Sequence, residues 1–481
     1  MDSLKDKRTP NEFRIALQSL PKGLGALDMA YDNAVRRIDD QGANSRTWAR
    51  RVLSWVFHAI RPLRPIELQH ALAITAGDCQ LQEDSLPVFE EVTSLCAGLV
   101  ILNQESHTIQ LVHYTTQEYF SNLDWIQASI GDITTSCITY LQFDDFESGS
   151  CPSKEEFEKR IDLHPFYVYA STSWGHHARA LSIEKEGLIM GFLESKAKVS
   201  ACSQALVKST FWYVKDEDVP GQATGVHLAA YFGLQKALVA LLSRGHDKDA
   251  RDGYGQNPLY WAVEGGNEEV VALLLSCGAN PNLYTEDVLW TPLLRAIFRK
   301  NENLIRLLLE SHADPNFRSQ GFAPLIFAIS LNYEKTVRIL LEYADPNLYS
   351  NGRTPLTFAI SLRHEEIVKI LLEYADPNLC SNGRTPLHFA IAAQHEGIIK
   401  FLLNYADPNL CSNGRTPLSY AICHEHEEAV RLLLESHADP NFGGVHDEIP
   451  LLWALYIKHE GIIKLLLKYI GPNLCSSGPA P

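Results

Sequence analysis

Several features that mark particular protein classes are missing from this sequence. No run of 18 apolar residues occurs in its 481 residues, and the first ten, MDSLKDKRTP, carry five charged side chains and no apolar segment. Neither a membrane-spanning helix nor a secretory signal is therefore predicted. The ten cysteines are scattered without a CxxC spacing, which is typical of reduced thiols. We expect an intracellular protein of the nucleus or cytoplasm, with no membrane contact.

A basic excess is also missing. The formal net charge is −16, and acidic side chains outnumber basic ones in each of the segments 1–128, 129–220 and 221–481. Phosphate binding needs clustered Lys and Arg, so we do not expect direct nucleic-acid binding. One local exception leaves an alternative open, because the stretch from Arg36 to Arg64 contains seven arginines against two aspartates. That stretch either reads DNA or forms a solvated helix face in a packed domain.

Catalytic and metal-binding patterns are absent as well. His424 and His426 lie two residues apart, so they do not share a helix face, and an HExxH spacing is not met. We expect them to be surface residues, and His176, His177 and His113 to be packing residues, the last on a strand. No nucleophile, base and orienting group can be nominated together. We therefore expect no enzyme, cofactor, metal or small-molecule substrate.

What the sequence does contain is an internal repeat. SNGRTPL occurs at Ser350, Ser381 and Ser412, and residues 342–360 match residues 373–391 at 17 of 19 positions. Similar starts recur at intervals of 31 to 34 residues, at Thr224, Asn257, Thr291, Ala323, Thr354, Thr385, Thr416 and Ile449. Self-similarity at this period indicates a stacked-repeat protein of about eight units.

Each unit predicts a pair of helices and a turn. Thr354 can cap a first helix that Pro355 opens, and residues 365–374 place an apolar stripe on a second, formed by Ile367, Ile370, Leu371 and Tyr374. Asn382-Gly383 supplies the positive φ values of a tight turn before the next Thr-Pro. One unit cannot cover its own stripe, so stability is expected to come from stacking.

These units resemble the ankyrin repeat, whose TPLHxA signature fits residues 221–475. Only His227 and His388 keep the signature histidine; Tyr260, Leu294, Ile326, Thr357, Ser419 and Leu452 replace it elsewhere. The 31-residue units lack one residue at the end of the second helix and one in the hairpin, which predicts shorter fingers. Where ankyrin repeats usually have glycine after the first helix, this chain has Asn332, Arg363, Gln394, Glu425 and Lys458, so we expect strained turns. The last unit is expected to be a degenerate cap.

The first half has a different pattern. A helix with Val52, Trp55, Val56 and Ala59 on one face is followed by Pro65, further helices and two short strands, LVIL and IQLVHY. Helices followed by a hairpin predict a winged helix. RPLRPIELQHALAI, CAGLVIL and LVHYTTQEYF resemble the winged-helix region that follows the NACHT domain in fungal NLR-like proteins. LQSLPKGLGALDMAYDNAVRRI resembles the end of a NACHT module, and HPFYVYASTSWGHHARAL the helical stretch before the ankyrin repeats of such proteins.

The expected fold is mainly α, an ankyrin-repeat α-solenoid behind a helical and winged-helix region. The predicted organisation is a helical stub (1–45), a winged-helix-like domain (46–128), a helical connector (129–220), ankyrin repeats (221–475) and a tail (476–481). The GxxxxGK[ST] loop of a NACHT nucleotide-binding domain does not occur. The chain therefore resembles the C-terminal part of such a protein, lacking the NTPase, unless a phosphate loop lies upstream of Met1.

Two ladders recur through the units. We expect the aromatic residues Trp261, Phe327, Phe358, Phe389, Tyr420 and Trp453 to be core. The hairpin tips should instead stack into a row of arginines with amide neighbours, and they supply the candidate partner-binding residues Tyr349, Asn351, Arg353, Cys380, Asn382, Arg384, Cys411, Asn413 and Arg415. Arginine forks suit acidic peptides. The alternative is that these tips are solvated loops copied by recent duplication.

The sequence thus indicates a non-enzymatic scaffold with a regulatory role that binds a protein partner, for which a transcription factor is a candidate. The first hypothesis is a transcriptional co-regulator or adaptor. The second is the recognition arm of an NLR-like fungal sensor, and the third is a nucleotide-driven switch whose phosphate loop lies upstream.

Overall fold

A computed structural model of the chain describes residues 24–180, 186–210, 222–284, 290–318, 323–444 and 449–470. The first part of the predicted stub and the tail at 476–481 lie outside these residues. The chain forms two compact units, Met1–Leu273 and Leu274–Pro481. In the parts that the structure describes, no helix combines the length and apolar character needed to cross a membrane.

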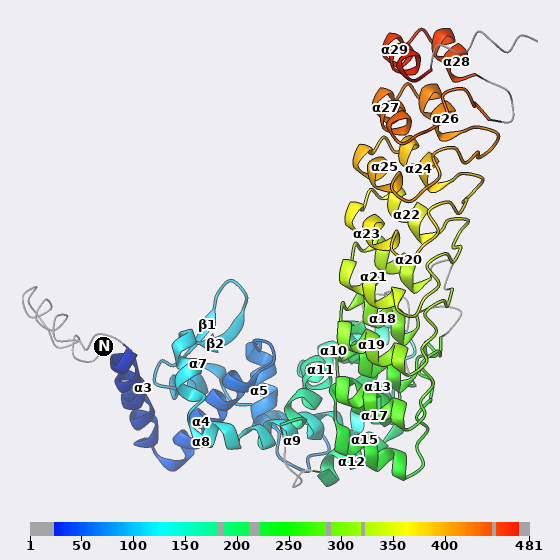
Figure 1. Ribbon diagram of the computed structural model, residues 1–481. Helices are drawn as coiled ribbons and strands as arrows, with labels where there is room; N and C mark the ends of the chain where they lie inside the picture. Colours follow the sequence, from blue (N-terminus) through cyan, green and yellow to red (C-terminus); the bar gives the residue numbers. More distant parts are fainter. Residues whose placement is uncertain are drawn as a thin grey trace, which may run out of the picture. The chain divides into compact units, whose positions relative to one another are not determined.

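The first unit begins with helices and one small sheet. Its elements up to the connector are α3 (Leu24–Asp39), α4 (Ala43–His58), α5 (Pro65–Ala73), α6 (Phe89–Ser94), β1 (Val100–Asn103), β2 (Thr108–Leu111), α7 (Tyr114–Phe120) and α8 (Asp124–Ala128). The two strands are antiparallel, with Val100 opposite Leu111 and Asn103 opposite Thr108. Val52 and Trp55 of α4 are buried, and the Trp55 ring packs against Phe166 and Tyr169. Val56 and Ala59, which the sequence pattern places on the same face, are half-buried. Helices α4, α5 and α6 and the β1–β2 hairpin form the predicted winged-helix arrangement (Figure 1).

The prediction that His113 lies on a strand is wrong. Strand β2 ends at Leu111, and His113 is the residue that caps α7. Its Nδ1 accepts a hydrogen bond from the Thr115 backbone N–H at 3.3 Å, which satisfies one of the unpaired donors at the helix start. The segment YTTQEYF therefore continues as a helix, and the hairpin is shorter than its apolar pattern suggested.

A helical connector follows, made of α9 (Ile130–Leu141), α10 (Lys154–Leu163), α11 (Tyr167–Ala178), α12 (Glu186–Glu194) and α13 (Lys196–Thr210). Trp174 is fully buried and its ring contacts Phe192 and Phe232 at centroid distances of 5.2 and 5.1 Å. Gly175 permits this packing, because a Cβ on it would lie 2.0 Å from the Phe232 ring. The connector is thus packed directly against the first repeat.

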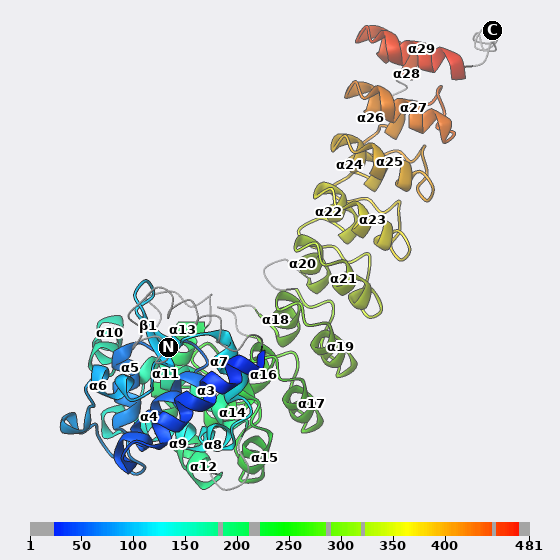
Figure 2. The same cartoon turned by 90° about the vertical axis from the view of Figure 1, so that its left-hand side faces the viewer.

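The repeats are pairs of short helices. In the first unit they are α14 (Gly225–Phe232), α15 (Gln235–Ser243) and α16 (Pro258–Glu264), and α17 (Glu268–Ser276) spans the division. The second unit contains α18 (Pro292–Phe298), α19 (Glu302–Glu310), α20 (Pro324–Ser330), α21 (Glu334–Leu341), α22 (Pro355–Ser361), α23 (Glu365–Leu371), α24 (Pro386–Ala392), α25 (Glu396–Leu402), α26 (Pro417–Cys423), α27 (Glu427–Glu435), α28 (Pro450–Tyr456) and α29 (Glu460–Tyr469). In this unit the first helices form one row and the second helices another (Figure 2).

Local chemistry starts and ends these helices as predicted. Thr354 accepts a hydrogen bond from the Thr357 N–H, and Pro355 follows at the first helical position. The second helix of the 31-residue repeats ends early, at Leu371 in α23, whereas α19 continues for nine residues. Tyr374 does not belong to the buried stripe but is 47% exposed. The chain tightens there into i→i−3 hydrogen bonds, from Glu373 N–H to Ile370 and from Tyr374 N–H to Leu371.

The turns between paired helices carry the expected strain. Asn332, Arg363, Gln394, Glu425 and Lys458 have φ values between +51° and +59°, a left-handed conformation that side chains with a Cβ disfavour. The helices on either side of each turn are fixed by burial, and they keep the backbone of the turn in this conformation.

Candidate functional site

The nine predicted partner-binding residues lie in three successive hairpin turns of the second unit. In each turn Asn and Gly have positive φ values, +50° and +74° for Asn351 and Gly352, as a type I′ turn requires. The flanking Ser350 and Arg353 exchange backbone hydrogen bonds of 2.8 and 3.0 Å. The asparagines are exposed, and Arg353 is half-buried. The predicted tight turn is confirmed.

The three turns stack directly on one another. A Cβ on Gly352 would lie 2.5 Å from Oδ1 of Asn382, and one on Gly383 would lie 2.6 Å from Oδ1 of Asn413. Tyr349 Oη donates a 2.5 Å hydrogen bond to the carbonyl of Cys380. Glycine is needed here for its conformation and for the close approach of the next turn. The structure thus brings the tips together in a continuous row.

Each arginine of this row lies over an aromatic ring of the following repeat. The Cζ atom of Arg353 is 6.0 Å from the ring centroid of Phe389, that of Arg384 is 5.5 Å from Tyr420, and that of Arg415 is 6.0 Å from Trp453. These are cation–π distances. We call these three pairs the Arg–aromatic ladder and each pair a rung.

The prediction that the recurrent aromatic residues are core is wrong for most of them. Trp261 is fully buried, but the residues at the same position of later repeats are only half-buried: Phe327, Phe358, Phe389, Tyr420 and Trp453. Alanine and isoleucine, such as Ala390 and Ile391, occupy the centre of the stack instead. The rings stand at its edge, where the guanidiniums of the ladder cover those of Phe389, Tyr420 and Trp453.

The three arginines of the ladder differ in their pairing from other arginines of this unit. Arg306, Arg338 and Arg431 pair with glutamates. Within the described residues no such ion pair is found for the three arginines of the ladder. Burial, with a contribution from Arg384, lowers the pKa of the neighbouring His388 to about 4, so this imidazole is neutral at pH 7. The ladder therefore offers guanidinium N–H donors, which match the geometry of carboxylates.

The cysteines of the tips add no covalent link. Cys380 and Cys411 are both free thiols. Burial raises the pKa of Cys411, and the carboxylate of Asp407 raises it further, which disfavours the reactive thiolate. The Cys411 thiol therefore contributes shape rather than reactivity to the surface.

A ladder of asparagines, which was not predicted from the sequence, runs through the ADPN segments and the equivalent ANPN segment at residues 279–282. The Oδ1 atom of the asparagine in one repeat accepts the backbone N–H of the aspartate in the next, at 2.7 to 2.9 Å, for the pairs Asn282/Asp314, Asn316/Asp345, Asn347/Asp376, Asn378/Asp407 and Asn409/Asp439. The recurrence of asparagine at this position was a visible signal. These bonds fix the register of the stack, so the asparagines are structural.

The histidines singled out in the sequence have structural roles. His424 ends α26 and His426 caps α27, accepting the Ala429 N–H at 3.2 Å. His177 is buried, its Nε2 is 3.2 Å from Tyr169 Oη, and burial lowers its pKa to about 3. In the described ranges of the chain, no three metal-ligating side chains come together.

The arginine-rich stretch of the first unit is also engaged within the fold. Arg61 and Arg64 both pair with the buried Glu67, at 2.8 and 3.3 Å. Arg46 donates to the carbonyl of Asp39. These contacts favour the interpretation of a packed helical domain over that of a DNA-reading face.

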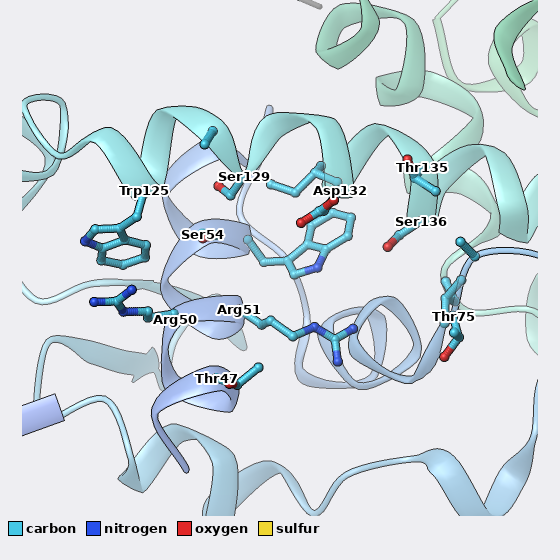
Figure 3. A pocket seen from close by; sticks show the side chains of 15 residues that line it. Thr47, Arg50, Arg51, Ser54, Thr75, Trp125, Ser129, Asp132, Thr135 and Ser136 are labelled. Atoms are coloured by element: carbon cyan, nitrogen blue, oxygen red, sulfur yellow. The ribbon is translucent and has the colours of Figure 1, made fainter. Parts of the chain in front are cut away.

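A cleft of about 600 Å³ opens between α4 and α9 (Figure 3). Arg50 and Arg51 reach into it from α4, opposite Trp125 and Asp132. Arg50 lies 5.0 Å over the ring of Trp125 and also pairs with Asp39 at 2.7 Å.

The second arginine of the cleft is occupied as well. Arg51 donates to the carbonyl of Leu72 at 2.6 Å and lies 5.1 Å over the ring of Trp48. Burial lowers its pKa, an effect that Asp132 opposes. Both guanidiniums of the cleft therefore already bind the helices together, and the ladder of the second unit is the stronger candidate site.

Comparison with protein families identifies the repeats and the preceding domain. The model described as ankyrin repeats (3 copies) matches six overlapping segments that together cover residues 200–477, more than half of the chain. The model described as GPI inositol-deacylase, winged helix domain, matches residues 38–129.

The relatives and solved structures share parts of the chain. B-cell lymphoma 3 protein homolog of Mus musculus is 35% identical over 22% of this chain and 24% of its own length. Calmodulin-binding transcription activator CBT of Oryza sativa subsp. japonica is 39% identical over 14% of this chain and 7% of its own length. The crystal structure of the ankyrin repeat domain of Bcl-3, titled a unique member of the IkappaB protein family, aligns with 27% identity and a TM-score of 0.40 over 44% of this chain and 99% of that one.

The matched segments thus span a quarter or less of the length of these curated relatives. Because ankyrin-repeat matches cover residues 200–477 and the helix pairs recur through the same range, this chain belongs to the ankyrin-repeat family, joined here to a winged-helix domain.

Proposed function

We propose that this chain is a non-enzymatic scaffold that regulates other proteins, acting as a transcriptional co-regulator or adaptor through a protein partner. The Arg–aromatic ladder carries the proposal. Ankyrin repeats present extended binding surfaces, and these three arginines have donors to offer while other arginines of the unit are held in ion pairs.

Of the two relatives, one is named a calmodulin-binding transcription activator, which favours transcription among the possible settings. The other is the B-cell lymphoma 3 protein homolog. Their similarity to this chain lies in short segments, so the pathway and the partner remain part of the proposal. The partner is a protein, with no direct contact to nucleic acid, in the nucleus or the cytoplasm.

The winged-helix match favours a second candidate. A winged helix before ankyrin repeats is the arrangement that the resemblance to fungal NACHT and NLR-like proteins implies, with residues 38–129 in the corresponding place. In that setting the repeats are the recognition arm of a sensor. A nucleotide-driven switch would need a phosphate loop upstream of residue 1, and mapping the 5′ end of the transcript tests that version.

Co-purification from the native cell tests the proposal. The full chain is compared with the triple variant Arg353→Glu, Arg384→Glu, Arg415→Glu, and partners are identified by mass spectrometry. We expect a transcription factor or another nuclear regulator to be captured by the wild type and lost by the variant.

Two other results would change the assignment. Capture of the same partners by both proteins would remove the ladder from the binding site. Capture of foreign or cell-wall molecules, lost in the variant, would support the sensor in place of the co-regulator.

A further inference from the structure

In each rung of the ladder, the ring orients the guanidinium and leaves some of its N–H donors available. Each guanidinium lies over a ring of the following repeat, 5.5 to 6.0 Å from its centroid, which orients the planar group. A guanidinium carries five N–H donors, and a ring under one face leaves those at its edge available to a second group. The ligand that suits such an edge is a carboxylate, bound through two parallel hydrogen bonds.

The spacing of the rungs limits the ligand further. Neighbouring repeats are packed helices, which stand about 8 to 10 Å apart. Adjacent turns touch, because Gly352 meets Asn382 and Gly383 meets Asn413, so the tips keep the spacing of the repeats. A ligand that uses all three rungs must present carboxylates at about this interval on one side.

The conformations of a bound peptide differ in whether they present side chains at this interval on one side. A polyproline II helix has 3 residues per turn and a rise of about 3.1 Å, which places every third side chain on one side at intervals of about 9 Å. A β-strand covers about 10 Å in three residues but turns the third side chain to the opposite face. An α-helix needs about seven residues for the same distance.

The asparagines beside the arginines favour a ligand in the polyproline II conformation. Asn351, Asn382 and Asn413 are exposed, one beside each arginine, and each amide has both donors and an acceptor. A polyproline II backbone has no internal hydrogen bonds, so its peptide groups can pair with these amides, whereas the backbone of an α-helix is already satisfied.

We propose that the Arg–aromatic ladder binds an acidic segment in the polyproline II conformation, with Asp or Glu at positions i, i+3 and i+6. Each carboxylate meets one of Arg353, Arg384 and Arg415. This inference rests on the proposed function, since it names the kind of protein segment that the repeats recognise.

Binding of synthetic peptides to the full chain, measured by fluorescence anisotropy, tests the register. Three proline-rich peptides of identical composition carry glutamates at every second, every third or every fourth position. We expect the peptide with glutamate at every third position to bind about ten-fold more tightly than the other two. Equal affinities would overturn the proposal, and so would tighter binding of a helical peptide with glutamate at every seventh position.

Matched variants separate the ladder from general charge. The triple variant Arg353→Gln, Arg384→Gln, Arg415→Gln is expected to lose the preference for the third-position spacing. The control, Arg306→Gln, Arg338→Gln, Arg431→Gln, makes the same change in net charge on arginines that pair with glutamates, and is expected to keep it. Equal losses in the two variants would assign the binding to net charge alone.

A separate variant tests the aromatic ring beneath Arg353. Phe389→Leu keeps the charge of Arg353 but removes the surface that orients it, so we expect several-fold weaker binding. The partner capture described above separates this inference from the proposed function. If no peptide binds while the ladder variant still loses its partners, the polyproline II ligand is wrong and the scaffold stands.

Discussion

The role of a single residue is clearest when it is compared with the residue at the same position of a neighbouring repeat. His388 contacts Thr385 Oγ1 through Nδ1 at 2.7 Å, and burial keeps the imidazole uncharged. Thr357 stands at the same position one repeat earlier, where its hydroxyl hydrogen-bonds Thr354 and Ser381. A small hydroxyl therefore performs the same structural task without a group that titrates near neutral pH.

This comparison predicts a pH effect for His388→Thr. The folded pKa, about 4, lies below the ordinary 6.5, so the unfolded chain binds a proton first as the pH falls. The contribution of His388 to stability is complete above pH 6.5, declines between about 6.5 and 4, and is lost below that. Between pH 7 and pH 5 the wild type should lose about 2 kcal/mol more free energy of unfolding than the variant. Urea unfolding at both pH values measures the difference, and parallel pH dependences would contradict it.

At the scale of the element, the turns show where the repeat tolerates strain. Gln394 lies between α24 and α25 with a φ of +51°, in a position that suits glycine. Its side chain is exposed, so removing it costs no buried contact.

We therefore expect Gln394→Gly to raise the free energy of unfolding by about 0.5 to 1 kcal/mol, since relief of the left-handed strain exceeds the added flexibility of glycine. Thermal or urea unfolding measures it. Gly383→Ala is the opposing control: its φ is +71° and the new Cβ would lie 2.6 Å from Oδ1 of Asn413, so it should destabilise. Destabilisation by Gln394→Gly would show that a side chain is required in this turn.

At the scale of the whole molecule, the 31-residue repeats are interchangeable parts. The junctions Tyr374-Ala375 and Tyr405-Ala406 lie in nearly the same sequence, EYADPNLC and NYADPNLC, which differ only at the first residue. The asparagine hydrogen bonds between repeats also have the same partners at each step. Stability in such a stack is close to a sum over repeats and their interfaces.

Deletion of residues 375–405 should consequently leave a folded protein with one repeat fewer. We expect a lower melting temperature, unchanged helical content per residue by circular dichroism, and weaker binding of the acidic peptide, because two rungs remain. A deletion of 375–398, which cuts a helix pair, is the control and should not fold in this region. Loss of structure in both deletions would mean that the repeats are not equivalent.

Most of the fold could be predicted because its signals are local. Thr-Pro starts, Asn-Gly turns and apolar stripes each act within a few residues, and they identify the helix pairs and the exposed tips. The winged helix is predicted in the same way, although the predicted second strand, IQLVHY, extends to Tyr114 and the observed strand ends at Leu111. The helix predicted to reach Tyr374 ends at Leu371, because the following residues form i→i−3 bonds, such as Tyr374 N–H to Leu371, in place of another α-helical turn.

The sequence by itself determined the repeat, its period and the nine residues at the hairpin tips, since each depends on backbone preferences of adjacent residues. The stacking of one repeat on the next decided what those residues contact. Arg353 and Phe389 are 36 residues apart, and nothing local joins them. They meet because stacking brings each hairpin tip within side-chain reach of the first helix of the following repeat. The row of arginines and the row of rings thereby form one surface.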